Sequence, residues 1–126
     1  MTVRELIGGE TAWIEPGDTV RHAAARMHEA DIGALAVETD GSLQGIVTER
    51  DVLRACAAGA DLDNVRVMQW MTPDPDSLSP EMSVDTAATW MLAAGYRHLP
   101  VVEDQAVIGV ISIKDILWAI TAPMVS

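Results

Sequence analysis

The sequence carries one stretch twice: Gly45-Ile46-Val47-Thr48-Glu49-Arg50-Asp51 and, 64 residues later, Gly109-Val110-Ile111-Ser112-Ile113-Lys114-Asp115. Each copy has a glycine, two β-branched residues, a hydroxyl residue, two variable positions and an aspartate. β-branched residues favour strands, and a Thr or Ser often precedes the first turn of a helix. The stretch therefore predicts a strand that leads directly into a helix, at two places in the chain.

The repetition extends well beyond these two stretches. At the same offset, Val3–Cys56 aligns with Val67–Ile120 without a gap, and 14 of the 54 aligned pairs are identical. A fixed offset of this kind indicates a tandem duplication. We expect a first repeat over residues 1–58, a polar linker over 59–66, a second repeat over 67–122 and a tail over 123–126.

Both repeats predict the same order of elements. Apolar residues at helical spacing indicate a helix over 20–30 and another over 84–94, with Thr19 and Ser83 as N-caps. Strands are expected at 12–14, 34–38 and 43–47, and at 77–78, 98–103 and 106–111; the final helices are expected from Thr48 to about 58 and from Ser112 to about 120. Asp40-Gly41 is a typical hairpin turn. The fold class is thus α/β (α+β), with two β-α-β-β-α units packed sheet to sheet, because one such unit buries little surface alone.

Composition excludes several classes of function. The 126 residues include 8 Lys and Arg against 19 Asp and Glu, a formal net charge of -11, which argues against binding to nucleic acid or to an anionic membrane. The chain has no apolar run long enough to cross a membrane and no signal-peptide pattern, so a cytoplasmic protein is expected. Its single cysteine, Cys56, allows no intrachain disulfide, and we expect it to be buried.

The repeated stretch supports two interpretations. A hydroxyl residue followed three positions later by an acid is close to a capping box, in which both side chains only satisfy backbone amides. The same arrangement offers a phosphate the start of a helix, and offers the two hydroxyls of a ribose a carboxylate. Arg50 and Lys114 lie beside the aspartates and can neutralise phosphate. The stretch alone leaves both interpretations open.

The paired stretches, Met71-Thr72 before the second repeat, and His98-Leu99-Pro100-Val101-Val102 together resemble tandem cystathionine-β-synthase (CBS) domain proteins, also called Bateman modules. The resemblance implies a stand-alone regulatory module that binds AMP, ADP, ATP or S-adenosylmethionine in clefts between the repeats. Such a module signals to a partner protein by a conformational change and needs no cofactor. The implied contacts to ribose and phosphate are Thr48, Arg50 and Asp51 in one cleft, and Ser112, Lys114 and Asp115 in the other.

The resemblance also implies where the adenine would lie. Its pocket would involve Ala12, Ile14 and Val47 in one repeat, and Asp76, Leu78 and Ile111 in the other. Arg97 and His98 can meet phosphates, whereas Gly33 and Ala34 at the matching positions cannot. We therefore expect two unequal clefts, with phosphorylated nucleotides preferring the one near Arg97 and His98.

Other functions have less support in the sequence. It contains no phosphate-binding loop, dinucleotide fingerprint or nucleophile motif, so we expect no enzyme activity. His22 and His28 are six residues apart and lie on different helix faces, so no metal site is expected. The alternative function is a ligand-free dimerisation scaffold in which the repeated stretches act only as helix caps.

The tryptophans differ between the repeats. Trp90 and Trp118 replace Arg26 and Arg54 of the first repeat. They fill the core of the second repeat or form a self-association surface, where tryptophan is enriched. The resemblance to CBS proteins, which pair through their helices, implies a homodimer.

Overall fold

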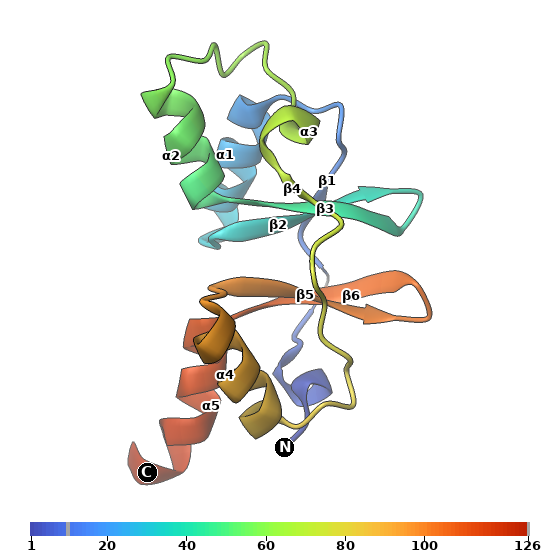
Figure 1. Cartoon of the computed structure of the whole chain (residues 1–126), viewed down its shortest axis with the longest axis vertical. Helices are drawn as coiled ribbons and strands as arrows, with labels where there is room; N and C mark the ends of the chain where they lie inside the picture. Colours follow the sequence, from blue (N-terminus) through green and yellow to red (C-terminus); the bar gives the residue numbers. More distant parts are fainter. Residues whose placement is uncertain (10, 126) are drawn as a thin grey trace. The chain divides into compact units, whose positions relative to one another are not determined.

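The computed structural model describes residues 1–9 and 11–125, with side chains to Ala122, and divides the chain into two compact units (Figure 1). The first-repeat unit is Ala12–Pro75. The second-repeat unit combines Met1–Thr11 with the chain from Asp76 onward. The N-terminal segment therefore belongs with the second repeat, although it precedes the first in sequence.

The first-repeat unit contains β1 (Trp13–Ile14), α1 (Val20–Ala30), β2 (Ala34–Thr39), β3 (Ser42–Thr48), α2 (Glu49–Ala57), α3 (Val67–Trp70) and β4 (Thr72–Pro73). Strands β2 and β3 form an antiparallel hairpin. Strand β1 pairs parallel with β2, and β4 pairs antiparallel with β3. Both long helices lie on the same side of the hairpin (Figure 1).

The second-repeat unit contains the short 3-10 helix η1 (Val3–Leu6), α4 (Val84–Ala94), β5 (His98–Glu103), β6 (Ala106–Ser112) and α5 (Ile113–Val125). Backbone bonds attach its two chain segments to each other: the Val3 amide donates to the Met82 carbonyl at 2.9 Å, and the Val84 amide donates to the Met1 carbonyl at 3.0 Å. Figure 1 shows the blue N-terminal segment beside the orange and red elements of this unit.

The helices and hairpins predicted from the repeat are confirmed, whereas the strand expected at 77–78 is reduced to an isolated parallel bridge between Leu78 and Val101. The side-chain oxygens of Thr19 and Ser83 each accept from a backbone amide of the following helix at 3.1 Å. The hairpin turn at Asp40-Gly41 has φ values of 52° and 78°, as a two-residue turn with positive φ at both positions requires. The second hairpin turns at Asp104 and Gln105, also with positive φ. The fold class is mixed α+β, as predicted.

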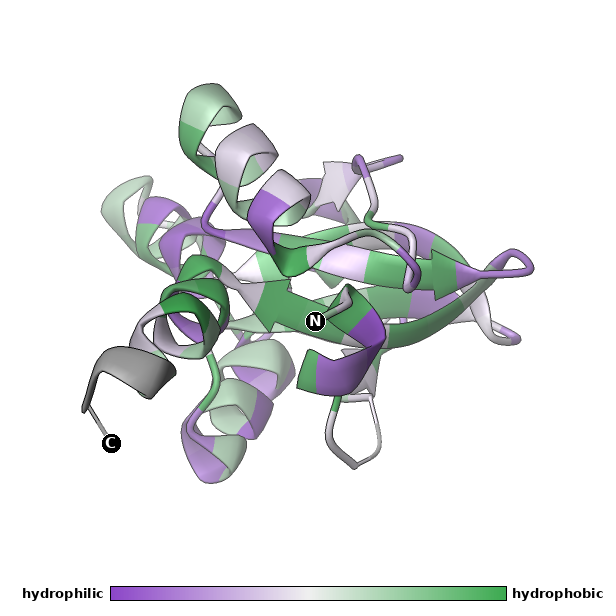
Figure 2. Ribbon diagram, turned by 90° about the horizontal axis from the view of Figure 1, so that it is seen from below, coloured by the Kyte–Doolittle hydropathy of each residue, from purple (hydrophilic) through white to green (hydrophobic). Residues whose placement is uncertain are grey.

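Each unit has an apolar core on the helix side of its hairpin. The first-repeat core includes Ile14, Leu35, Val37 and Val47, all fully buried. The second-repeat core includes Leu78, Met91, Leu99, Ile111 and Ile116. In Figure 2 the strands are largely green and the loops at their ends purple, as expected when strands supply the core and turns meet water.

The segment predicted as a linker makes backbone contacts inside the first-repeat unit. Residues 59–66 do not simply join two units, because this segment bonds to the start of α1 within the first-repeat unit. The amides of Val20 and Arg21 donate to the carbonyls of Val65 and Leu62, both at 3.0 Å. The compact units are divided near residues 11 and 75, whereas the predicted repeat boundaries describe the duplication.

Helix α5 continues past its expected end near residue 120 and reaches Val125, so it includes residues that the sequence assigned to a tail. The Thr121 hydroxyl donates to the Leu117 carbonyl one turn earlier at 2.8 Å. Ser126 lies outside the described residues. None of the helices in the described ranges is long and apolar enough to span a bilayer.

Candidate functional site

The first motif copy forms a complete capping box at the start of α2. The Thr48 amide donates to Asp51 Oδ2 at 2.9 Å, and the Asp51 amide donates to Thr48 Oγ1 at 3.3 Å. The Thr48 hydroxyl lies 3.2 Å from the same carboxylate oxygen. The first motif copy therefore caps its helix, as the capping-box interpretation of this stretch predicts.

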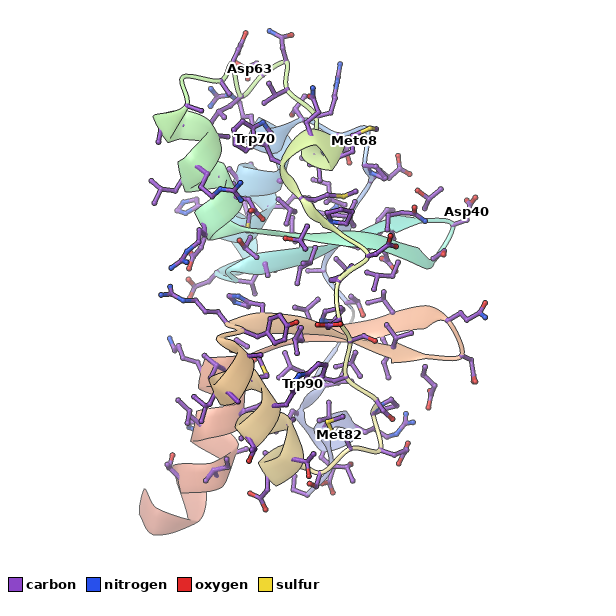
Figure 3. All side chains as sticks on the ribbon, in the orientation of Figure 1. Asp40, Asp63, Met68, Trp70, Met82 and Trp90 are labelled. Carbon is purple, nitrogen blue, oxygen red and sulfur yellow. The ribbon has the colours of Figure 1, made fainter. Side chains whose placement is uncertain are left out.

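A further side chain engages the other oxygen of Asp51. Arg54 Nη1 donates to Asp51 Oδ1 at 3.0 Å, and the Arg54 guanidinium carbon lies 5.9 Å from the centre of the Trp70 ring. Trp70, labelled in Figure 3, belongs to the short helix α3. Asp51 is only 5% exposed. Both carboxylate oxygens are thus occupied by groups of the same unit.

The second motif copy has the same cap and different surroundings. The Ser112 amide donates to Asp115 Oδ2 at 2.9 Å, and the Asp115 amide donates to Ser112 Oγ at 3.0 Å. Trp118 stands at the position matching Arg54 and is 71% exposed. Asp115 is exposed, and no ion pair to it occurs within the described part of its unit.

Backbone register brings two more predicted residues to the second motif. His98 lies opposite Ser112 in the β5–β6 hairpin, and the carbonyl of Arg97 accepts from the Ile113 amide at 2.8 Å. Arg97 is exposed and His98 is half-buried. In the first repeat the same places hold Gly33, whose carbonyl accepts from Glu49, and Ala34. Arg97 and His98, predicted to contact phosphate, therefore adjoin the second motif along the backbone, together with exposed Lys114, while Arg50 is exposed at the first.

Most of the residues assigned to an adenine pocket are buried. The side chains of Ile14, Val47, Leu78 and Ile111 are at most 2% exposed and pack in the two cores. Ala12 is half-buried and its carbonyl accepts from the Ala36 amide.

Asp76, the sixth residue assigned to the adenine pocket, is exposed and accepts a hydrogen bond from the Tyr96 hydroxyl. This bond to the carboxylate raises the pKa of Tyr96 above its ordinary value. Asp76 therefore has a partner within its own unit.

The motif glycines are sites of close approach. A Cβ at Gly45 would lie 2.6 Å from the Thr72 carbonyl oxygen and 2.7 Å from the Met71 sulfur. A Cβ at Gly109 would lie 3.1 to 3.3 Å from Ile7. The sequence showed these glycines as one identical pair. Ile7 and Met71, which are themselves matched at the repeat offset, approach them closely, so a side chain would clash at Gly45 and would crowd Ile7 at Gly109.

The expectation for Cys56 needs correction, and the two alternatives for the tryptophans can be compared with the structure. Cys56 is exposed, not buried, because it lies on the outer face of α2. Trp118 is also exposed and fills no core, whereas Trp90 is half-buried, packs against the second-repeat core and meets Tyr96 edge to face at 5.7 Å (Figure 3).

Sequence reasoning missed the contacts of Arg54 with Asp51 and Trp70. The replacement of Arg54 by Trp118 in the aligned repeats was the signal that could have found them.

Comparison with known proteins gives a consistent result. The family model for the CBS domain matches residues 3–58 and 66–122. The CBS domain-containing protein YhcV of Bacillus subtilis is 30% identical over 116 residues, which are 91% of this chain and 82% of YhcV. Among solved structures, a putative signal-transduction protein with CBS domains from Burkholderia ambifaria is 32% identical with a TM-score of 0.90, over 97% of this chain and 95% of that one.

A third similar protein was solved with a ligand. The CBS domain protein PAE2072 from Pyrobaculum aerophilum, complexed with AMP, is 26% identical with a TM-score of 0.85, over 97% of this chain and 99% of that chain. The duplicated sequence, the two units with matching elements and the two family matches agree. This chain belongs to the CBS domain family and carries two CBS domains in tandem.

Proposed function

We propose that this protein is a regulatory module that binds an adenosine-containing ligand at its motifs and signals to a partner protein by a conformational change. The observation that carries the proposal is the second motif, where an exposed aspartate, a serine and the start of a thirteen-residue helix lie beside Arg97 and His98. AMP in the similar Pyrobaculum protein supports this choice of ligand class.

The chemistry of the second motif suits a nucleoside phosphate. The Asp115 carboxylate can accept hydrogen bonds from both hydroxyls of a ribose. Backbone amides at the start of α5, with Lys114 and Arg97, favour the negative charge of a phosphate. This role requires no bond to be made or broken, so the proposed module is not an enzyme and needs no resident cofactor. Signalling requires only that the ligand bind one conformation more tightly than another.

Calorimetric titration with AMP, ATP and S-adenosylmethionine tests the proposal. We expect at least one of them to bind, and a ligand at one hundred times its Kd to stabilise the fold by about 2.7 kcal/mol in a thermal melt. Asp115→Asn keeps an oxygen that can cap the helix and should weaken binding strongly. Asp104→Asn, in the exposed β5–β6 turn, removes the same charge and serves as the matched control.

The complete capping boxes favour a second candidate, a ligand-free scaffold in which both motifs only hold their helices. In that case no adenosyl ligand would bind or raise the melting temperature, and Asp51→Ala and Asp115→Ala would change stability alone. Binding of any one of the three ligands that depends on Asp115 excludes this candidate.

We also infer that the protein forms a homodimer through its second-repeat helices. Helices α4 and α5 expose Leu92, Leu117, Trp118 and Ile120. Four exposed large apolar side chains on two packed helices offer uncharged contacts, which a chain with net charge -11 needs in order to associate with itself.

Sedimentation velocity tests the dimer. Trp118→Arg, which places at this position the arginine found in the first repeat, should shift the protein toward monomer. Leu53→Arg, at an exposed leucine of α2, is the control and should leave the dimer unchanged. A monomeric wild-type protein contradicts the inference.

A further inference from the structure

One difference between the two motifs lies in the contact that the aspartate makes beyond its helix cap. In the first repeat, Arg54 donates to Asp51 Oδ1 at 3.0 Å while the Thr48 amide donates to Oδ2, so both oxygens of this buried carboxylate already accept hydrogen bonds from the protein. In the second repeat, Trp118 replaces Arg54 and has no cationic group to pair with Asp115. The two caps have matching backbone bonds. Arg54 is therefore the added contact that Asp51 has and that Asp115 lacks within the described residues.

Arg54 is held in place from its other side. Its guanidinium lies over the Trp70 ring, a contact that favours a fixed position for the cation. Within the Asp51–Arg54 pair, 7% of the aspartate side chain is exposed and 60% of the arginine side chain. Trp70, Arg54, Asp51 and Thr48 thus form a continuous chain of contacts from α3 to the end of β3.

We propose that Arg54 keeps the first motif closed to ligand, so that an adenosyl ligand binds at the second motif first and reaches the first motif only when the Arg54–Asp51 pair opens. This inference rests on the proposed function and adds to it an order of binding and the residue that sets the order. A ligand at Asp51 must displace the Arg54 guanidinium, whereas position 118 holds a tryptophan in place of that cation at Asp115. The affinity of the two motifs for the same ligand therefore differs.

A measurement without ligand tests the closed state directly. Carbodiimide coupling of glycinamide to carboxylates, read by peptide mass spectrometry, should label Asp115 readily and Asp51 poorly. Arg54→Ala should raise labelling of Asp51 several-fold and leave Asp115 unchanged. Arg26→Ala is the matched control, because Arg26 also stacks on a tryptophan, Trp13 at 5.8 Å, and has no bond to Asp51. Equal labelling of both aspartates in wild type, or poor labelling of Asp51 in Arg54→Ala, overturns the proposal.

Titration with AMP then tests the order. We expect one tight equivalent per chain in wild type and a second equivalent in Arg54→Ala that is about tenfold tighter than in wild type. Arg54→Trp, which copies the second repeat, should behave like Arg54→Ala, and Arg26→Ala should behave like wild type. The reciprocal Trp118→Arg should weaken the first equivalent.

The outcomes separate this inference from the proposed function. Two equal equivalents in wild type overturn the order of binding and leave the ligand-binding function intact. If AMP, ATP and S-adenosylmethionine all fail to bind wild type and Arg54→Ala, the proposed function and the order fall together, whatever the labelling shows.

Discussion

The two motif copies have the same backbone arrangement and different surroundings. Each ends a strand, caps a helix through a hydroxyl and an aspartate, and begins with a glycine that a neighbouring segment approaches closely. The first copy is enclosed by Arg54 and Trp70, and the second has exposed Asp115 and Trp118. The duplication thus preserved the residues that build the turn and let the residues around it diverge.

The largest difference in stability is expected at the glycines. Gly45→Ala should destabilise the protein by about 3 kcal/mol, because the new methyl group would meet the Thr72 carbonyl oxygen, which the β3–β4 pairing holds in place. Gly109→Ala should cost about 1 kcal/mol, because the Ile7 side chain can move by a few tenths of an ångström. Urea unfolding measures both, and equal losses would contradict the proposed difference in close approach.

Removing the two aspartate side chains should give losses of stability that differ by less than those of the two glycine variants. Asp51→Ala removes a buried cap and leaves Arg54 without its partner, so we expect a loss of about 2 kcal/mol. Asp115→Ala removes an exposed cap and should cost about 1 kcal/mol. Thermal melts of both variants in ligand-free buffer give the comparison. A larger loss at Asp115 would mean that enclosure by Arg54 adds nothing to the first cap.

The smallest effect is expected at Glu38, where the second repeat has Val102. Burial raises the pKa of Glu38 above its ordinary value of 4.5, so the folded state holds the proton more tightly than the unfolded chain. The resulting loss of stability is absent well below pH 4.5 and grows as the pH rises toward the folded-state pKa. Glu38→Gln should therefore raise the melting temperature at pH 7 and leave it unchanged at pH 3.5. A variant with the same pH dependence as wild type would contradict this.

The fold was largely predictable because the helical spacing of apolar residues and the strand-to-helix motif each occur twice in the chain. Helical spacing from Val20 to Ala30 recurs from Val84 to Ala94, and a pattern seen twice at one offset is hard to mistake. The short elements η1, α3 and β4 were missed, because four residues or fewer carry no periodicity. They are set by contacts distant in sequence, such as that between the Val3 amide and the Met82 carbonyl.

The candidate site was predictable only in part. The hydroxyl and aspartate of each motif were found, since their spacing is local. Arg54 and Asp51 are three residues apart on α2, a spacing at which helical side chains meet, so their pairing was open to prediction. The contact of Arg54 with Trp70 depends on the position of α3, which the sequence did not predict. Burial of Ile14 and Leu78 likewise depends on strands that pair with distant partners.

The N-terminal segment packs with the second repeat, and this arrangement has a consequence for synthesis on the ribosome. Residues 12–75 form a continuous unit and can complete it as soon as they emerge. Met1–Thr11 leave the ribosome before this unit, yet their partners at Pro80 and Met82 follow some eighty residues later. This segment therefore has to wait for the second repeat before it can pack, and a fragment that ends at Pro75 would carry the segment without the rest of the unit to which it belongs.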